Sequence, residues 1–188
     1  SLNLVNVDGV AGDELVFDTP YDSTGTCVLY GISGGDRAVF TATTLDIVGS
    51  GAGAGQITGD FIVKGYDDGS SNPFFFGSAI VGADVNGDGT NELVFSDYTY
   101  QHSVGDYPTA KGEVYVLNGA TLTGTQSLTS ASSLMHTIRT EIEGNIGTQI
   151  AVIDQPRAGD TADWLAINSI GQRNVRIFKG TSNPGTGE

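Results

Sequence analysis

The stretch "GADVNGDGTNELVF", residues 82–95, places polar oxygen-bearing side chains at alternate positions and then runs directly into apolar residues. Asp84, Asn86 and Asp88 alternate with glycine or valine, and a glutamate closes the run immediately before "LVF" (93–95). Polar and glycine-rich residues followed by a short apolar run predict a turn and then a buried strand. The stretch therefore predicts one strand. It also raises the question of why negatively charged residues lie directly before that strand.

The same arrangement recurs along the chain. "NVDGVAGDELVF" (6–17) aligns with "DVNGDGTNELVF" (84–95), and "GTQIAVIDQPRAGDTADWLAIN" (147–168) forms a third copy. The acidic residue before the strand recurs as Glu14, Glu92 and Asp163. Further apolar strands are expected at 25–31, 112–119 and 173–180, then at 60–65 and 139–144. Four antiparallel strands per repeat are typical of a propeller blade.

These repeats predict an all-β fold in one domain, residues 1–188. We expect an incomplete, or pseudo, β-propeller of about three blade-like antiparallel sheets, because closed propellers have about four to eight blades. The repeats span approximately residues 1–65, 66–144 and 145–188. We also expect the segment 2–7 and the last strand, 174–178, to lie inside sheets. The abrupt apolar start suggests a piece of a longer chain.

The charge of the chain excludes several classes of partner. Eight Lys and Arg residues stand against 22 Asp and Glu residues, which gives a formal net charge of −14. Such a surface repels nucleic acids and anionic lipid headgroups, and no apolar run is long enough to span a bilayer as a helix. We therefore expect no nucleic-acid binding and no membrane insertion. Cys27 is the only cysteine, so no disulfide framework exists.

The segment "FGSAIVGADVNGDGTNELVFSD" followed by "GEVYVLNG" resembles the FG-GAP repeat of integrin α-subunit propellers and of related bacterial surface proteins. Phe76-Gly77 matches the first signature of that repeat, and residues 84–92 match its calcium loop. The first and third copies match only weakly. An incomplete propeller of this size also resembles the distal, receptor-binding part of vertex spikes of lipid-containing marine bacteriophages.

The resemblance implies a calcium site in the loop between the first two strands of the second repeat. Its ligands would be the side chains of Asp84, Asn86, Asp88 and Glu92 and the backbone carbonyl of Thr90. Calcium takes six to eight oxygen ligands, and the alternate positions suit three side-chain oxygens. The alternative is a polar turn without metal, since Asn, Asp and Gly favour turns for conformational reasons. The loop is not an EF-hand, because strands flank it.

The other two copies are weaker metal candidates. In the first, Asn6, Asp8 and Glu14 occupy ligand positions, but Val10 replaces the third ligand, which favours a metal-free turn. In the third, the loop is one residue longer and carries a proline where the second ligand would be. Its candidate ligands are Asp154, Asp160 and Asp163.

No catalytic motif is present, and we expect no enzyme. The two histidines lie in different repeats, without a nucleophile elbow or a zinc-binding pair. In a four-stranded meander, the loop after the second strand lies opposite the calcium loop. In the second repeat that loop (96–112) carries the candidate receptor-binding residues Tyr98, Tyr100, His102 and Tyr107, because tyrosines are enriched at recognition surfaces.

Two functions remain open from the sequence. The first is a calcium-stabilised attachment domain of a viral (phage) spike or surface adhesin, which recognises a cell-surface receptor or glycan on the host. The second is a calcium-dependent structural spacer or assembly module of the parent protein. Either would be found outside the cell or on a virion surface.

Overall fold

The computed structural model describes residues 2–7, 12–19, 28–32, 46–48, 56–58, 61–65, 76–98, 112–128, 133–139 and 144–181. They form strands and one short 3-10 helix, η2 (Gly119–Thr121). No helix in these ranges has the length and apolar character needed to cross a bilayer. The strands are β1 (Leu2–Val5), β2 (Glu14–Thr19), β3 (Val28–Ile32), β4 (Asp46–Val48), β5 (Gln56–Thr58), β6 (Phe61–Lys64), β7 (Phe76–Ala83), β8 (Glu92–Asp97), β9 (Glu113–Leu117), β10 (Gly124–Ser127), β11 (Leu134–Arg139), β12 (Ile146–Ile153), β13 (Trp164–Ser169) and β14 (Asn174–Lys179).

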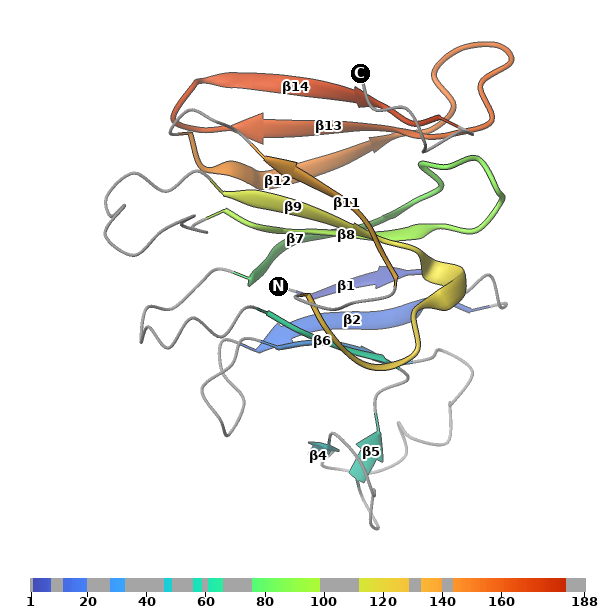
Figure 1. The fold of residues 1–188 in the computed structure, drawn as a ribbon, viewed down its shortest axis with the longest axis vertical. Helices are drawn as coiled ribbons and strands as arrows, with labels where there is room; N and C mark the ends of the chain where they lie inside the picture. The colour runs from blue at the N-terminus through green and yellow to red at the C-terminus, as the bar shows by residue number, and fades with distance from the viewer. Residues whose placement is uncertain are drawn as a thin grey trace.

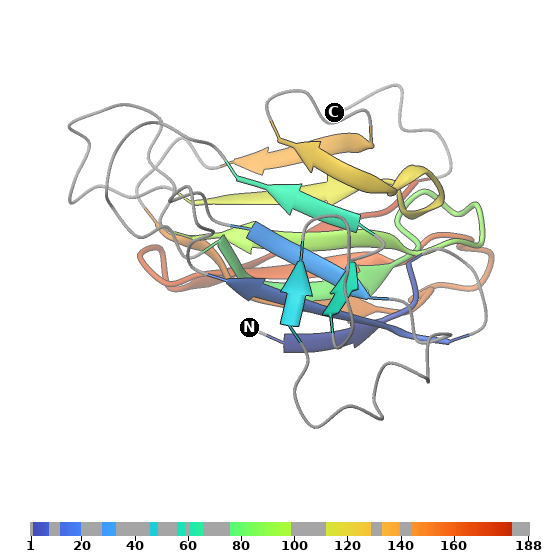
Figure 2. The same cartoon turned by 90° about the horizontal axis from the view of Figure 1, so that it is seen from below.

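The strands form three larger sheets and one small pair (Figure 1). The first sheet has the order β1-β2-β3-β6-β10, the second β7-β8-β9-β11, and the third β12-β13-β14. Neighbouring strands in them are antiparallel, except that β10 runs parallel to β6. The parallel pair β4–β5 lies below the first sheet (Figures 1 and 2). Each larger sheet therefore follows chain order from an edge strand, although β10 joins the first sheet only after the chain has formed β7, β8 and β9 of the second.

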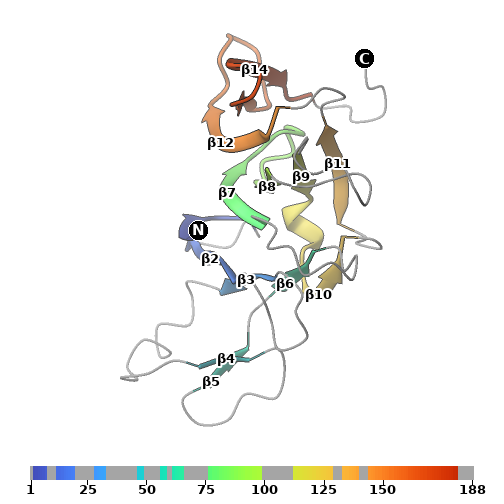
Figure 3. The ribbon, with the colours of Figure 1, turned by 90° about the vertical axis from the view of Figure 1, so that its left-hand side faces the viewer.

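The three sheets stack as layers, with the second sheet in the middle (Figure 3). Alternate residues of its central strand β8 point to opposite sides, as the strand period of two requires. Leu93 and Phe95 belong to the core shared with the first sheet, whereas Val94 belongs to the core shared with the third. All three side chains are fully buried. The middle sheet therefore has two buried faces, and its strands read as continuous apolar runs.

β7 and β12 contain bulges at equivalent places. The register with the neighbouring strand shifts between Phe76 and Ile80 in β7, and between Ile146 and Ile150 in β12. Gly77 and Gly147 follow the first residue of each strand with φ of 76° and 90°. A Cβ on Gly147 would lie 2.7 Å from the Ser96 side chain, so this glycine allows the third sheet to approach the second closely.

Ser96 satisfies backbone groups of both bulges. Its hydroxyl donates to the Gly147 carbonyl at 2.5 Å and accepts the Ala79 N–H at 3.2 Å. Ser96 is fully buried. One side chain of the middle sheet thus ties together the first strands of two repeats.

The all-β prediction is confirmed, the predicted last strand 174–178 lies within a sheet, and of the predicted segment 2–7 the residues Leu2–Val5 do so. β1 pairs with β2 over Leu2–Val5, and β14 pairs with β13 over Asn174–Lys179. The second sheet has its last strand at Leu134–Arg139, whereas most of the predicted strand 139–144 lies outside the described residues. Leu134 packs against the core shared with the first sheet and Ile138 against the core shared with the third, because a bulge between Leu134 and His136 shifts the alternation of the strand.

Candidate metal centre

The loop between β7 and β8 is ordered by the carboxylate of Asp84. One of its oxygens accepts the N–H groups of Gly87 at 2.7 Å and Asp88 at 3.1 Å, and the other accepts Gly89 N–H at 2.9 Å. Gly87 and Gly89 have φ of 75° and 89°, a region that favours glycine. The loop therefore curls around Asp84 because two glycines permit the positive φ angles.

Glu92 lies beneath this loop at the start of β8 and is fully buried. Its Oε2 accepts the backbone N–H groups of Val85 at 2.9 Å and Asn86 at 3.3 Å. The pKa of Glu92 is raised to about 7, chiefly by burial and further by the negative charges of Asp88 and Asp84, although the two backbone hydrogen bonds lower it. The ionised form of the Glu92 carboxyl group is therefore unfavourable at this position.

The Asn86 amide lies between two of the carboxylates. Its Nδ2 donates to Asp88 Oδ2 at 2.9 Å and to Glu92 Oε1 at 2.9 Å. Asp88 in turn accepts Thr90 N–H through its other oxygen at 2.8 Å. No described Lys or Arg forms an ion pair with these acids. The N–H groups of the Asn86 amide and of the backbone therefore turn the positive ends of their dipoles toward Asp88 and Glu92.

These residues fit a calcium ion by the chemistry of their donors. The three carboxylates, the Asn86 side-chain oxygen and the Thr90 carbonyl are all oxygen ligands, as calcium prefers. Within the ranges that the structure describes, however, no three Asp, Glu, His or Cys side chains converge into a metal-holding group. The loop as described is closed by hydrogen bonds, and a cation would replace the contacts of the Asn86 amide.

Both neighbouring sheets hold the loop in place. Asp163 N–H donates to the Asp84 carbonyl at 2.7 Å, and Asp84 N–H donates to Asp163 Oδ2 at 3.0 Å. Thr181 N–H donates to the Val85 carbonyl at 2.9 Å. On the other side, Asn91 Nδ2 donates to the Asn6 carbonyl at 2.8 Å. The candidate metal loop is therefore the point at which the three repeats meet at this end of the molecule.

The recurring acid has one structural role in all three repeats. Glu14 accepts Val7 N–H at 2.7 Å, Glu92 accepts Val85 N–H, and Asp163 accepts Gln155 N–H at 3.3 Å. Each acid is buried, and each accepts from the loop that precedes its own strand. The sequence repeat thus corresponds to a repeated hydrogen bond.

The three acids of the third loop are not brought together. Asp154 is exposed. Asp160 Oδ1 lies 3.9 Å from Lys179 Nζ, and both Asp163 oxygens accept backbone N–H groups. Burial raises the pKa of Asp163. In the first repeat, Asn6 Nδ2 donates to the Gly12 carbonyl at 3.0 Å, while Asp8 and Val10 lie outside the described residues.

The candidate receptor loop leaves the opposite end of the second sheet. β8 ends at Asp97, which pairs with Glu113 at the start of β9, and this end of the two strands is opposite the end that carries the candidate metal loop. Tyr98 is half-buried, whereas Tyr100, His102 and Tyr107 lie outside the described residues.

The base of this loop holds polar residues that the sequence did not single out. Asp97 and Glu113 are both buried. Tyr115 Oη donates to Glu113 Oε2 at 2.6 Å, and Arg139 Nε lies 2.5 Å from Glu113 Oε1. The burial of Glu113 could have been inferred only from knowledge that β11 brings Arg139 beside it.

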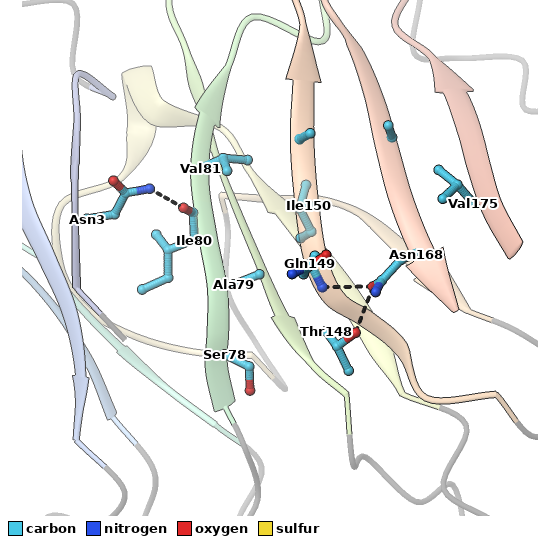
Figure 4. A pocket seen from close by; sticks show the side chains of 12 residues that line it. Asn3, Ser78, Ala79, Ile80, Val81, Thr148, Gln149, Ile150, Asn168 and Val175 are labelled. Carbon is cyan, nitrogen blue, oxygen red and sulfur yellow. Dashed lines mark hydrogen bonds between the residues drawn. The ribbon is translucent and has the colours of Figure 1, made fainter. Parts of the chain in front are cut away.

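A groove of about 640 Å³ follows the first strands of the three repeats (Figure 4). Thr148 Oγ1 and Gln149 N–H both donate to Asn168 Oδ1, at 2.8 and 2.7 Å, and Asn3 Nδ2 donates to the Ile80 carbonyl. Its polar groups are thus largely engaged within the protein. The groove is lined by uncharged residues: Asn3, Ser78, Ala79, Ile80, Val81, Thr148, Gln149, Ile150, Ala151, Ala166, Asn168 and Val175.

Comparison with known proteins adds no relative to this picture. No protein-family model and no curated protein matches the chain.

Proposed function

We propose that this chain is a calcium-stabilised attachment domain of a spike or surface adhesin. In this proposal the metal loop makes the layered sheets rigid, and the loop after β8 presents the tyrosines 98, 100 and 107 and His102 to a host receptor or glycan. The observation that carries the calcium part is Glu92, a fully buried carboxyl beside Asp84 and Asp88 without a described basic partner. Calcium would supply the positive charge that this cluster lacks.

The arrangement of strands supports an incomplete propeller as the scaffold. The second sheet is a four-stranded antiparallel meander with one segment inserted before its last strand. β1, β7 and β12 begin the three repeats, and residues from all three strands line one groove. Blades of a propeller place corresponding strands around a common channel in this way. A rigid body with loops at both ends suits an attachment function.

The calcium part is tested by thermal unfolding of metal-stripped protein with and without added calcium, together with titration calorimetry. Ligand that binds only the native state adds about 2.7 kcal/mol of stability at a concentration of 100 times Kd. We expect Tm to rise by several degrees with calcium in the wild type, and much less in Asp88→Asn. Superimposable curves for the wild type would refute calcium binding.

The attachment part needs a separate readout. The intact domain is applied to a glycan array and to intact marine bacteria, beside a Tyr100→Ala, Tyr107→Ala variant. We expect saturable binding by the wild type and loss of binding by the variant, with the calcium-dependent Tm unchanged. A domain that binds calcium but none of these surfaces would favour the structural spacer instead.

A further inference from the structure

The third sheet has no described strand in the place that β6 and β11 take in the other two larger sheets. β6 pairs antiparallel with β3, and β11 pairs antiparallel with β9. The equivalent strand of the third sheet is β14, which pairs only with β13 among the described strands. It lies at the top of the molecule in Figure 1. The outer edge of β14 therefore presents a row of backbone N–H and C=O groups that no described strand uses.

The strand register identifies the position that an added strand would take. Val94 pairs with Val116 in the second sheet as Ala166 pairs with Ile177 in the third, since both pairs follow equivalent bulges. β11 then places His136 opposite Val116. A strand added to β14 in the direction of β11 would therefore place a residue opposite Ile177 and continue the antiparallel order of the third sheet.

The hairpin that carries this edge has a net positive charge in an acidic chain. Residues 164–181 contain Arg173, Arg176 and Lys179 and no Asp or Glu, whereas the whole chain has a formal net charge of −14. The equivalent hairpin of the first sheet, 15–32, contains two aspartates and no basic residue. The edge of β14 therefore attracts negative charge, unlike the corresponding edge of the first repeat.

The basic side chains of β14 are only partly engaged within the protein. Lys179 Nζ lies 5.5 Å from the centre of the Trp164 ring and 3.9 Å from Asp160 Oδ1, and the lysine side chain is 57% exposed. Arg176 Nη2 donates to Gln172 Oε1 at 2.7 Å. Among the described acids, Asp160 is the one that forms an ion pair with either base. The charge of Arg176 therefore has no described acidic partner, and that of Lys179 has one at a long distance.

A charge pair between strands already helps to hold the last strand of the second sheet. Arg139 of β11 lies opposite Glu113 of β9, and their side chains form an ion pair of 2.5 Å. There the accepting strand carries the acid and the added strand carries the base. On β14 the accepting strand carries the bases, so an added strand needs acids opposite Arg176 and Lys179. Two β14 edges from two copies of the chain would instead bring bases beside bases, which opposes their pairing.

We propose that the edge of β14 binds an extended acidic segment of a partner protein, which joins the third sheet as an antiparallel strand. In strand addition, main-chain hydrogen bonds supply affinity and side chains supply specificity. Here the acidic side chains of the segment would pair with Arg176 and Lys179. Raised salt should weaken the contact, because it screens exposed charges. The proposal rests on neither the calcium loop nor the receptor loop.

NMR titration of the isotope-labelled protein with synthetic peptides tests the contact. The acidic probe is acetyl-TEVVEVT-amide, whose glutamates have the spacing to lie opposite Lys179 and Arg176, and the basic probe is acetyl-TKVVKVT-amide. With the acidic probe we expect saturable shifts of the β14 amide signals and of the indole signal of Trp164, the single tryptophan of the chain. The basic probe should bind weaker by about tenfold or more.

Two variants locate the charges that select the probe. Arg176→Gln with Lys179→Gln should weaken binding of the acidic probe by about tenfold. The matched control is Arg157→Gln, which removes an exposed base beside Trp164 but outside β14, and which should bind the probe as the wild type does. Both variants should retain the wild-type far-UV spectrum. Equal binding by the basic and acidic probes, or shifts that fall outside β14, would overturn the proposal.

Backbone methylation of the acidic probe separates strand addition from attraction between charges alone. The N–H groups of alternate residues point to the same side of a strand. Methylation of one alternate set of nitrogens should therefore abolish binding to the wild type, and methylation of the other set should preserve it. Two methylated probes that bind equally well would contradict strand addition. Sedimentation of the protein alone should show a monomer, because self-association with shifts in β14 would make a second copy the occupant of the edge.

Discussion

The Glu92 carboxyl lies where folding removes water without supplying a described basic side chain. Its pKa is about 7 in the folded protein, against an ordinary value of 4.5. Because the folded pKa is raised, the native state holds more protons than the unfolded chain between these two pH values. The free energy of unfolding of metal-free protein therefore falls as pH rises through this window.

Glu92→Gln should remove that dependence on pH while keeping an acceptor for the Val85 N–H. We expect the metal-free variant to exceed the wild type in stability by up to about 3 kcal/mol above pH 7, since each pKa unit corresponds to about 1.4 kcal/mol. With saturating calcium the order should reverse, because the variant lacks a carboxylate ligand. Urea unfolding across this pH range, with and without calcium, measures both effects. Parallel profiles for the two proteins would show that Glu92 stays charged without cost.

At the scale of elements, the contacts between loops hold the candidate metal site in place more than the strands that these loops join. Asp163 was interpreted from the sequence as a weak metal ligand, yet its backbone and side chain hold the backbone of Asp84. The pairing Ile153↔Trp164 corresponds to Ala83↔Glu92, so Asp163 lies one residue before its strand. A shift of one residue along a strand changes where a side chain lies. The sequence alone therefore did not reveal that Asp163 would contact the backbone of Asp84.

Asp163→Ala should loosen the candidate metal loop from the third sheet. We expect a loss of about 2 kcal/mol in stability, because two backbone donors lose a charged acceptor, and calcium affinity weaker by about tenfold, as for other residues that support metal ligands. The matched control is Asp154→Ala, which removes the same charge nearby from an exposed position. Calorimetric titration should separate the two variants. Equal affinities would mean that Asp163 serves only the third loop.

At the scale of the whole molecule, the layered arrangement makes the N-terminal segment part of the core. Val5 and Val7 are 7% and 1% exposed and belong to the core between the first and second sheets. Asn3 Nδ2 also donates to the Ile80 carbonyl of the second sheet. Periodicity and repeats predicted these strands well, because alternation and glycine-bounded apolar runs are local signals. They could not predict β10, whose partner lies in another repeat.

Deletion of residues 1–7 should therefore abolish cooperative folding. Two buried valines are lost, each worth about 1.5 to 3 kcal/mol on burial, and β2 becomes an unpaired edge. Far-UV spectroscopy and thermal melting measure the outcome, with Leu4→Thr as a control that changes the same strand at an exposed position. A truncated protein that melts like the wild type would mean that β1 is dispensable.

The parallel pairing of β10 with β6 also bears on how the chain reaches its native state. Gly124 aligns with Phe61, so the first sheet receives its last strand only after the chain has passed through β7, β8 and β9. During synthesis the edge of β6 therefore stays open until residues 124–127 emerge from the ribosome. Such sequence-distant pairing slows folding, because the long loop must close before the contact forms. It also means that the repeats are not independent cassettes that recombination could shuffle, since removal of the second would leave the first unfinished.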